Sequence, residues 1–140
     1  MYKITFNISK EIHCIYGSIA AVINEAETGT KEEKSDFISA VFEAVNNASI
    51  FAYPNQENKP ITVEIVVYKN SIEVTVTDKG CGIKDLEKAQ EPLFSTEYDH
   101  AGLGFSIMKN STDIFKVSSA VGSGTSVTLI KNFKEELYEL

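Results

Sequence analysis

The sequence predicts an α+β fold, a two-layer sandwich in which helices cover one face of a mixed, mainly antiparallel sheet. Five segments have the composition or the two-residue period of β-strands, and three have the 3.6-residue period of amphipathic helices. Their order along the chain is strand, two helices, two strands, helix and two strands. The length of 140 residues, with 43% hydrophobic content, suits one compact domain.

The first elements are a strand and a helix. Residues 2–8 alternate hydrophobic with polar side chains, which is the period of a half-buried strand. Ser9 is the expected N-cap of a helix that follows directly. The hydrophobic residues of this helix recur until the glycine-containing segment 28–30, where we expect the helix to end.

A second helix and a strand pair come next. Thr30 and Glu33 have the spacing of a capping box, so the helix is expected to start there. The polar segment 54–59 predicts a loop. Segments 61–68 and 72–77 are rich in Val, Ile and Thr, and the short turn between them predicts a hairpin of central strands.

The last third of the chain is more varied. It starts with a segment without clear periodicity, after which residues 103–108 suggest a third helix. Segments 114–119 and 125–130 read as two further strands around a Gly-Ser-Gly turn. Residues 133–140 are interpreted as a frayed helical tail.

The composition excludes several classes of protein. A formal net charge of -7 argues against direct binding to nucleic acid or to an anionic membrane, because phosphate backbones need clustered basic residues. All 13 basic residues are Lys, so phosphate contacts must come from Lys, His, backbone amides or a metal ion. The isolated Cys14 and Cys81 indicate a reducing compartment. With no hydrophobic run long enough to span a membrane, the sequence predicts a soluble cytoplasmic protein.

Three motifs in a fixed order indicate nucleotide binding. Glu43 and Asn47 are one helical turn apart, so they face the same way and could hold a metal ion and a water. A hydrophobic strand ends in Asp78 and is followed by a glycine pair. A second pair precedes the third helix, where free amides at a helix N-terminus would favour phosphate oxygens. These pairs are Gly80 and Gly82, and Gly102 and Gly104.

The segments that carry these motifs resemble the GHKL ATPase superfamily, whose members share the Bergerat nucleotide-binding fold. The segments are 43–48, 78–83, 91–96 and 102–108. Within the superfamily they look most like the anti-sigma factor serine kinases, over nearly the whole chain. The resemblance implies one ATP-binding kinase domain over residues 1–140, with an ATP lid at about 90–103 and with ATP and Mg²⁺ as cofactors.

The resemblance also implies roles for individual residues. Asn47 would ligate Mg²⁺, and Glu43 would be the catalytic carboxylate that accepts or orients the proton of an incoming serine hydroxyl. Asp78 would accept a hydrogen bond from the adenine amino group, and Thr125 would reach the adenine region. The other cofactor-binding residues implied in this way are Asn46, Gly80, Gly82, Ile83, Ser95, Thr96, Gly102, Leu103 and Gly104.

The chain departs from the family pattern at three places. Phe51 and Ala52 stand where relatives often have His-Gly or His-Ala, which removes a polar contact near the metal site. Relatives carry an arginine in the lid, and His100 or Ala101 occupies that place here, so phosphate handling is expected to be weaker or pH-sensitive. Tyr16 aligns with an arginine of the first helix that serves partner recognition.

The resemblance leaves three functions open. The first is a kinase that sequesters a sigma factor and phosphorylates a STAS-domain anti-anti-sigma factor. The second is a catalytically weak, nucleotide-dependent binding module, which the missing lid arginine favours. The third is a switch kinase that acts on stressosome-type STAS proteins. Family members form homodimers, and the edge of the opening strand would permit pairing with a second copy.

Overall fold

The computed structural model of the protein describes residues 1–90 and 99–133 and contains one five-stranded sheet. The strand order is β1-β2-β3-β5-β4, and every neighbouring pair of described strands is antiparallel, so no mixed pairing is present among them. The predicted α+β class is confirmed. The strands are β1 (Tyr2–Ile8), β2 (Ile61–Val67), β3 (Ser71–Asp78), β4 (Ile114–Ala120) and β5 (Gly124–Asn132).

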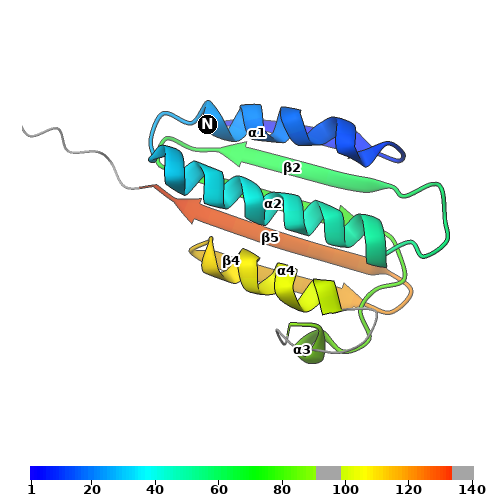
Figure 1. Ribbon diagram of the computed structural model, residues 1–140. Helices are drawn as coiled ribbons and strands as arrows, with labels where there is room; N and C mark the ends of the chain where they lie inside the picture. The colour runs from blue at the N-terminus through cyan, green and yellow to red at the C-terminus, as the bar shows by residue number, and fades with distance from the viewer. Residues whose placement is uncertain (91–98, 134–140) are drawn as a thin grey trace, which may run out of the picture.

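Three helices form the second layer and lie together on one face of the sheet (Figure 1). They are α1 (Tyr16–Asn24), α2 (Lys31–Phe51) and α4 (Asp99–Asn110). Helix α2 runs across the middle of the sheet, with α1 on the β1 side and α4 on the β4 side. Among the described residues, no helix combines the length and the hydrophobicity needed to cross a membrane.

The core lies between α2 and the central strands. In β2 and β3 every second side chain is buried, which is the pattern of a sheet covered on one face only. The register sets Val63 opposite Val76 and Ile65 opposite Val74, so the buried side chains of the two strands meet across the hairpin. The 21 residues of α2 supply the opposing layer, which includes the fully buried Phe37.

The start of α2 follows the sequence prediction. The backbone N–H of Glu33 donates to Thr30 Oγ1, and the N–H of Thr30 donates to the Glu33 carboxylate, both at 3.0 Å. This reciprocal pair satisfies two N–H groups that a helix end otherwise leaves open. The cap therefore fixes where the helix begins.

The start of the first helix differs from the prediction. A short 3₁₀ turn over Ile12–Ile15 precedes α1, and its N-cap is Glu11, not Ser9. Glu11 has a left-handed backbone with φ of 53°, and no side chain caps this turn. The bend at Glu11 breaks the path from Ser9 into a helix, so the predicted Ser9 cap is wrong.

The helix near the end of the chain begins earlier than the sequence suggests. It extends from Asp99, so Gly102 and Gly104 lie inside α4 and not at its N-terminus. A further short helix, α3 (Leu86–Ala89), was not predicted; Asp85 caps it by accepting the N–H of Lys88 at 3.2 Å. Most of the predicted lid and tail, residues 91–98 and 134–140, lie outside the described part of the chain.

Candidate functional site

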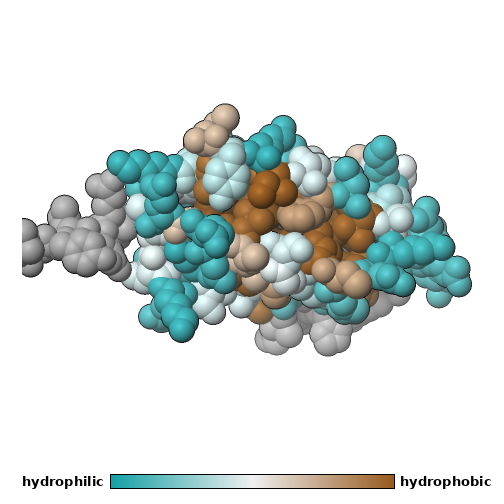
Figure 2. Space-filling model, turned by 90° about the horizontal axis from the view of Figure 1, so that it is seen from above, coloured by the Kyte–Doolittle hydropathy of each residue, from teal (hydrophilic) through white to brown (hydrophobic). Residues whose placement is uncertain are grey.

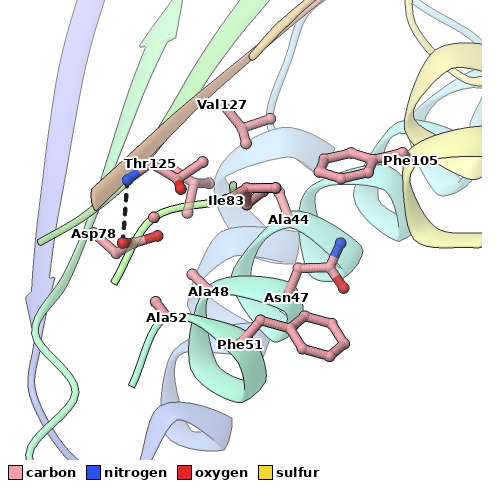
Figure 3. A pocket seen from close by; sticks show the side chains of 12 residues that line it. Ala44, Asn47, Ala48, Phe51, Ala52, Asp78, Ile83, Phe105, Thr125 and Val127 are labelled. Atoms are coloured by element: carbon pink, nitrogen blue, oxygen red, sulfur yellow. Dashed lines mark hydrogen bonds between the residues drawn. The ribbon is translucent and has the colours of Figure 1, made fainter. Parts of the chain in front are cut away.

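A pocket opens between α2, α4 and the adjoining ends of β3 and β5 (Figure 3). One wall is a row of small side chains, Ala44, Ala48 and Ala52, which recur every four residues and so share one face of α2. Their methyl groups leave room that larger side chains would fill. The other lining residues are Asn47, Phe51, Val76, Asp78, Gly82, Ile83, Phe105, Thr125 and Val127.

Asp78 is the acidic group in this mostly hydrophobic pocket, and only 6% of its surface is exposed. Its Oδ1 accepts two backbone N–H groups, from Gly80 at 2.9 Å and from Thr125 at 3.2 Å. Within the described residues both donors go to this one oxygen, so Oδ2 remains as an acceptor for a ligand. Burial raises the pKa of Asp78 above its ordinary value, and the two N–H bonds oppose that rise.

The glycine loop after Asp78 packs against the C-terminal end of α2. The N–H of Cys81 donates to the Ala52 carbonyl at 2.9 Å, and a Cβ on Gly80 would overlap that same carbonyl. Gly82 has φ of 75°, a left-handed conformation that glycine adopts without strain. These two glycines therefore allow their loop to pack closely against other backbone segments of the protein, the Ala52 and Ala120 carbonyls.

Glu43 and Asn47 converge on α4. A Cβ built on Gly104 would lie 3.0 Å from Glu43 Oε2 and 3.0 Å from Asn47 Nδ2. A larger residue at this position would require the two side chains to shift by a few tenths of an ångström. The predicted pairing of Glu43 and Asn47 on one face of α2 is thus present, and Gly104 is brought to the same place.

The amide of Asn47 fits the predicted metal role. Its Nδ2 is buried and has no hydrogen-bond partner among the described residues. The two ends of an amide are exchangeable by a flip, so this orphaned position can equally present the oxygen that Mg²⁺ prefers. In residues 1–90 and 99–133, no three His, Cys, Asp or Glu side chains cluster as metal ligands. Nucleotide phosphates and water would have to complete the coordination shell.

The other predicted residues divide into four groups. Gly82, Ile83 and Thr125 line the pocket, whereas Asn46 is half-buried and, like Gly80, does not. Ser95 and Thr96 lie outside the described residues. Gly102 and Leu103 are in the helical body of α4.

The environment of Glu43 includes an aromatic residue. Tyr16 packs on Phe42 with ring centroids 4.6 Å apart. Burial raises the pKa of the Tyr16 hydroxyl, and the negative charge of Glu43 raises it further. Tyr16 therefore lies close enough to the predicted catalytic carboxylate for its charge to be felt.

Sequence reasoning missed two hydroxyl groups that hold the pocket together. Tyr53 OH accepts the N–H of Lys79 at 2.7 Å and donates to the Pro60 carbonyl at 2.5 Å, which ties the end of α2 to both ends of the β2–β3 hairpin. Ser119 on β4 accepts the N–H of Ile83 at 2.7 Å. Lys79 is 26 positions from Tyr53 and Ile83 is 36 positions from Ser119, so no local pattern signals these two contacts.

The fold and pocket together define an ATPase-type nucleotide-binding domain, and comparison with known proteins agrees. The family model described as a histidine kinase-like ATPase domain matches residues 15–131. A blue-light activated histidine kinase of Erythrobacter litoralis superposes with a TM-score of 0.60 at 20% identity over 87% of this chain and 42% of its own. The mycobacterial sensor histidine kinase MprB superposes at 0.55 and 16% identity, over 94% and 99% of the two chains. At these identities the likeness concerns the fold.

Closer relatives narrow the class. The chain is 36% identical over 121 residues to the anti-sigma F factor of Geobacillus stearothermophilus, covering 85% of this chain and 82% of that protein. It is 38% identical over 120 residues to the anti-sigma F factor of Pasteuria penetrans, covering 84% and 79%. The chain belongs to the histidine kinase-like ATPase family, in its anti-sigma F factor branch.

Proposed function

We propose that the protein is an anti-sigma factor and an ATP-dependent protein serine kinase, which binds a sigma factor and phosphorylates a STAS-domain anti-anti-sigma factor. The observation that carries the proposal is the convergence of Glu43, Asn47 and Gly104 beside a hydrophobic pocket that contains Asp78. The shared name of relatives that match over four fifths of the chain supports the sigma-factor partner.

The pocket accounts for recognition of the nucleotide base. Asp78 Oδ2 would accept the adenine amino group, and the alanine row of α2 with Ile83 and Val127 would cover the faces of the ring. Burying a base between hydrophobic walls with one fixed acceptor is the usual construction of a small-molecule site. Asn47, about 1.4 turns before the C-cap residue Ala52 of α2, would hold Mg²⁺, which neutralises phosphate charge when bound.

Glu43 would act on the incoming serine. As the serine Oγ forms its bond to the γ-phosphorus, the bond from that phosphorus to the bridging oxygen breaks and its electron pair leaves with ADP. The serine proton passes to the Glu43 carboxylate, which lies one helical turn from Asn47. Positioning and charge neutralisation supply the rest of the rate.

The test is transfer of labelled γ-phosphate from Mg-ATP to a purified STAS-domain protein, with Glu43→Ala as the control. Serine labelling that the variant loses supports the kinase. Labelling of a stressosome-type STAS protein without any binding of a sigma factor would favour the switch kinase instead.

One observation favours a second function. The chain contains no arginine, so no guanidinium is available to stabilise the phosphoryl group in transfer. A nucleotide-dependent binding module would bind ATP tightly and hold its protein partner without labelling it. Tight ATP binding together with absent transfer would select this alternative.

We also propose that the active form is a homodimer. Strand β1 is an edge of the described sheet, and a hydrophobic band runs along the side of the molecule that carries α1 and β1 (Figure 2). Half-buried side chains of these elements include Phe6, Ile8 and Val22. Equilibrium sedimentation should give twice the 15.4 kDa mass of one chain; a monomer at micromolar concentration would contradict the proposal.

A further inference from the structure

Ser119 is the centre of a small hydroxyl network behind the pocket. Its Oγ accepts the N–H of Ile83 at 2.7 Å and lies 3.2 Å from the Gly124 carbonyl. It also lies 2.7 Å from Thr125 Oγ1. Ile83 and Thr125 line the pocket, and Ser119 does not. A residue outside the wall therefore contacts two residues of the wall.

The number of protons in this network is fixed. A serine hydroxyl has one proton to donate, and a carbonyl oxygen can only accept. Either hydroxyl could donate in the contact between Ser119 and Thr125, but a hydrogen bond to the Gly124 carbonyl uses the one proton of Ser119. Both contacts are hydrogen bonds when Ser119 donates to Gly124 and Thr125 donates to Ser119. The opposite assignment would leave the Gly124 contact with no proton. In the arrangement that satisfies every contact, the single proton of Thr125 points away from the pocket.

The consequence concerns the polar groups that face a ligand. With its proton engaged, the Thr125 hydroxyl offers lone pairs only, and the free oxygen of ionised Asp78 also offers lone pairs only. Both groups belong to the same pocket. At the Asp78 end of the pocket these two side chains therefore offer only acceptors, which are complementary to an amino group and repel a carbonyl oxygen. Asn47, another polar side chain of the wall, belongs to α2.

We propose that Ser119 is a positioning residue for base specificity: by holding the Thr125 proton, it makes the pocket select 6-amino purines over 6-oxo purines. The inference rests on the proposed nucleotide site and adds a residue that neither the motifs nor the pocket wall identify. Ser119 acts through Thr125, so its loss changes discrimination between bases in addition to affinity.

The experiment compares Mg-ATP with Mg-ITP, whose bases differ by a 6-amino and a 6-oxo group, by calorimetric titration of the full chain. The variant is Ser119→Ala. Ser119→Thr keeps the hydroxyl, and the matched control is Ser118→Ala, an exposed neighbour on the same strand. Wild type should prefer ATP by about 100-fold, because an unpaired or repelled polar group is costly in a buried site.

In Ser119→Ala the freed Thr125 proton can turn toward a 6-oxo group, so the preference should narrow about tenfold. Ser119→Thr and Ser118→Ala should keep the wild-type ratio. Equal weakening of ATP and ITP binding in Ser119→Ala would mean a structural role only and would overturn the inference.

Two further measurements keep the outcome decisive. If circular dichroism shows that Ser119→Ala is unfolded, Thr125→Val is measured in its place, because it removes the hydroxyl that Ser119 orients. The ratio of ATP affinity to ITP affinity should then narrow. An unchanged ratio overturns the inference. Wild-type protein that binds ATP and ITP equally would overturn the inference that Asp78 and Thr125 select a 6-amino group, but would leave the proposal of nucleotide binding intact. Wild-type protein that binds neither would overturn the proposed function itself.

Discussion

The backbone N–H of Thr125 donates to Asp78 Oδ1 at 3.2 Å and joins two residues that are 47 positions apart in the chain. Asp78 ends β3 and Thr125 lies at the start of β5, so the bond joins the two strands beside the pocket. Because Gly80 donates to the same oxygen, the carboxylate is held in one orientation. Its other oxygen receives neither of these bonds and lies in the wall of the pocket, where a ligand could donate to it.

Asp78→Asn should weaken ATP binding and stabilise the fold. Asn retains an oxygen for the two N–H groups but replaces the acceptor for adenine by a donor, so ATP affinity should fall at least about tenfold. The neutral side chain also removes a buried charge, and the free energy of unfolding at pH 7 should rise by about 1 kcal/mol. Calorimetric titration and urea unfolding measure the two effects; equal ATP affinity would refute the role of Asp78.

The stabilisation by Asp78→Asn should depend on pH. The folded pKa of Asp78 is raised above its unfolded value, so its contribution to stability is present at low pH and is lost as pH rises through the folded pKa. The variant lacks this titration. The difference in unfolding free energy between variant and wild type should therefore be small near pH 4 and grow toward pH 7. A constant difference across this range would show that the Asp78 pKa is not raised.

Glu43→Gln should separate binding from chemistry. The amide keeps the size of the side chain but cannot take the serine proton, so transfer should fall by about 10²–10⁴-fold while ATP affinity stays within about twofold. Single-turnover transfer and calorimetric titration test this. Glu64→Gln is the matched control, because it makes the same chemical change on β2, where Glu64 pairs with Lys3 and does not line the pocket. Unchanged transfer in Glu43→Gln would remove Glu43 from the chemistry.

Asn47→Ala should abolish the dependence of ATP binding on Mg²⁺. Wild-type protein should bind ATP more tightly with Mg²⁺ than with EDTA, and the variant should bind equally in both, at the lower affinity. The same substitution at the exposed Asn110 is the control. A variant that keeps the full Mg²⁺ effect would place the metal ion elsewhere.

Gly80→Ala should destabilise the protein. The added Cβ would overlap the Ala52 carbonyl, which is backbone and cannot turn aside, so the expected loss is about 1–3 kcal/mol of unfolding free energy. Gly17→Ala in α1 is the contrasting substitution. Nothing lies within 4 Å of its Cβ, and alanine should add about 0.5–1 kcal/mol there. Thermal unfolding of both variants checks the opposite signs.

Gly104→Ala should impair function without loss of the fold. Its Cβ would lie 3.0 Å from the side-chain ends of Glu43 and Asn47, which can move. Alanine should stabilise α4 by about 0.5–1 kcal/mol, while displacement of the two side chains should reduce transfer about tenfold. Unchanged transfer would show that the close contact is not needed for chemistry.

Local patterns predicted most of the fold. The alternation in residues 2–8 and the Thr30–Glu33 spacing are each visible within a few positions of the chain, and the corresponding strand and cap are present. The Ser9 cap failed because a left-handed Glu11 redirects the chain. The early start of α4 was missed because a glycine pair reads as a helix boundary, whereas Gly104 is a contact with α2.

The site was predictable only where its residues share a motif. Glu43 and Asn47 follow from helical spacing, and Asp78 follows from its place at the end of a strand. Ser119 has no such signal, because its partners Ile83 and Thr125 reach it only once β4 pairs with β5 and the glycine loop folds back. Networks that assemble across strands need coordinates to be seen.

The hydrogen bond from the Cys81 N–H to the Ala52 carbonyl attaches the loop after β3 to the end of α2, so the helix fixes how far this loop lies from residues one turn or more earlier. The loop beside the proposed base site is bonded to the helix end at Ala52, the proposed metal ligand is Asn47, and five helical residues give a rise of about 7.5 Å between them. In the proposed site, the helix would therefore set the distance between the base and the phosphates. Inserting one alanine between Asn47 and Ala52 would add about 1.5 Å to the separation of these two residues and rotate Asn47 by about 100° around the helix axis relative to Ala52. Small shifts of the side chains around the base could not compensate for this displacement.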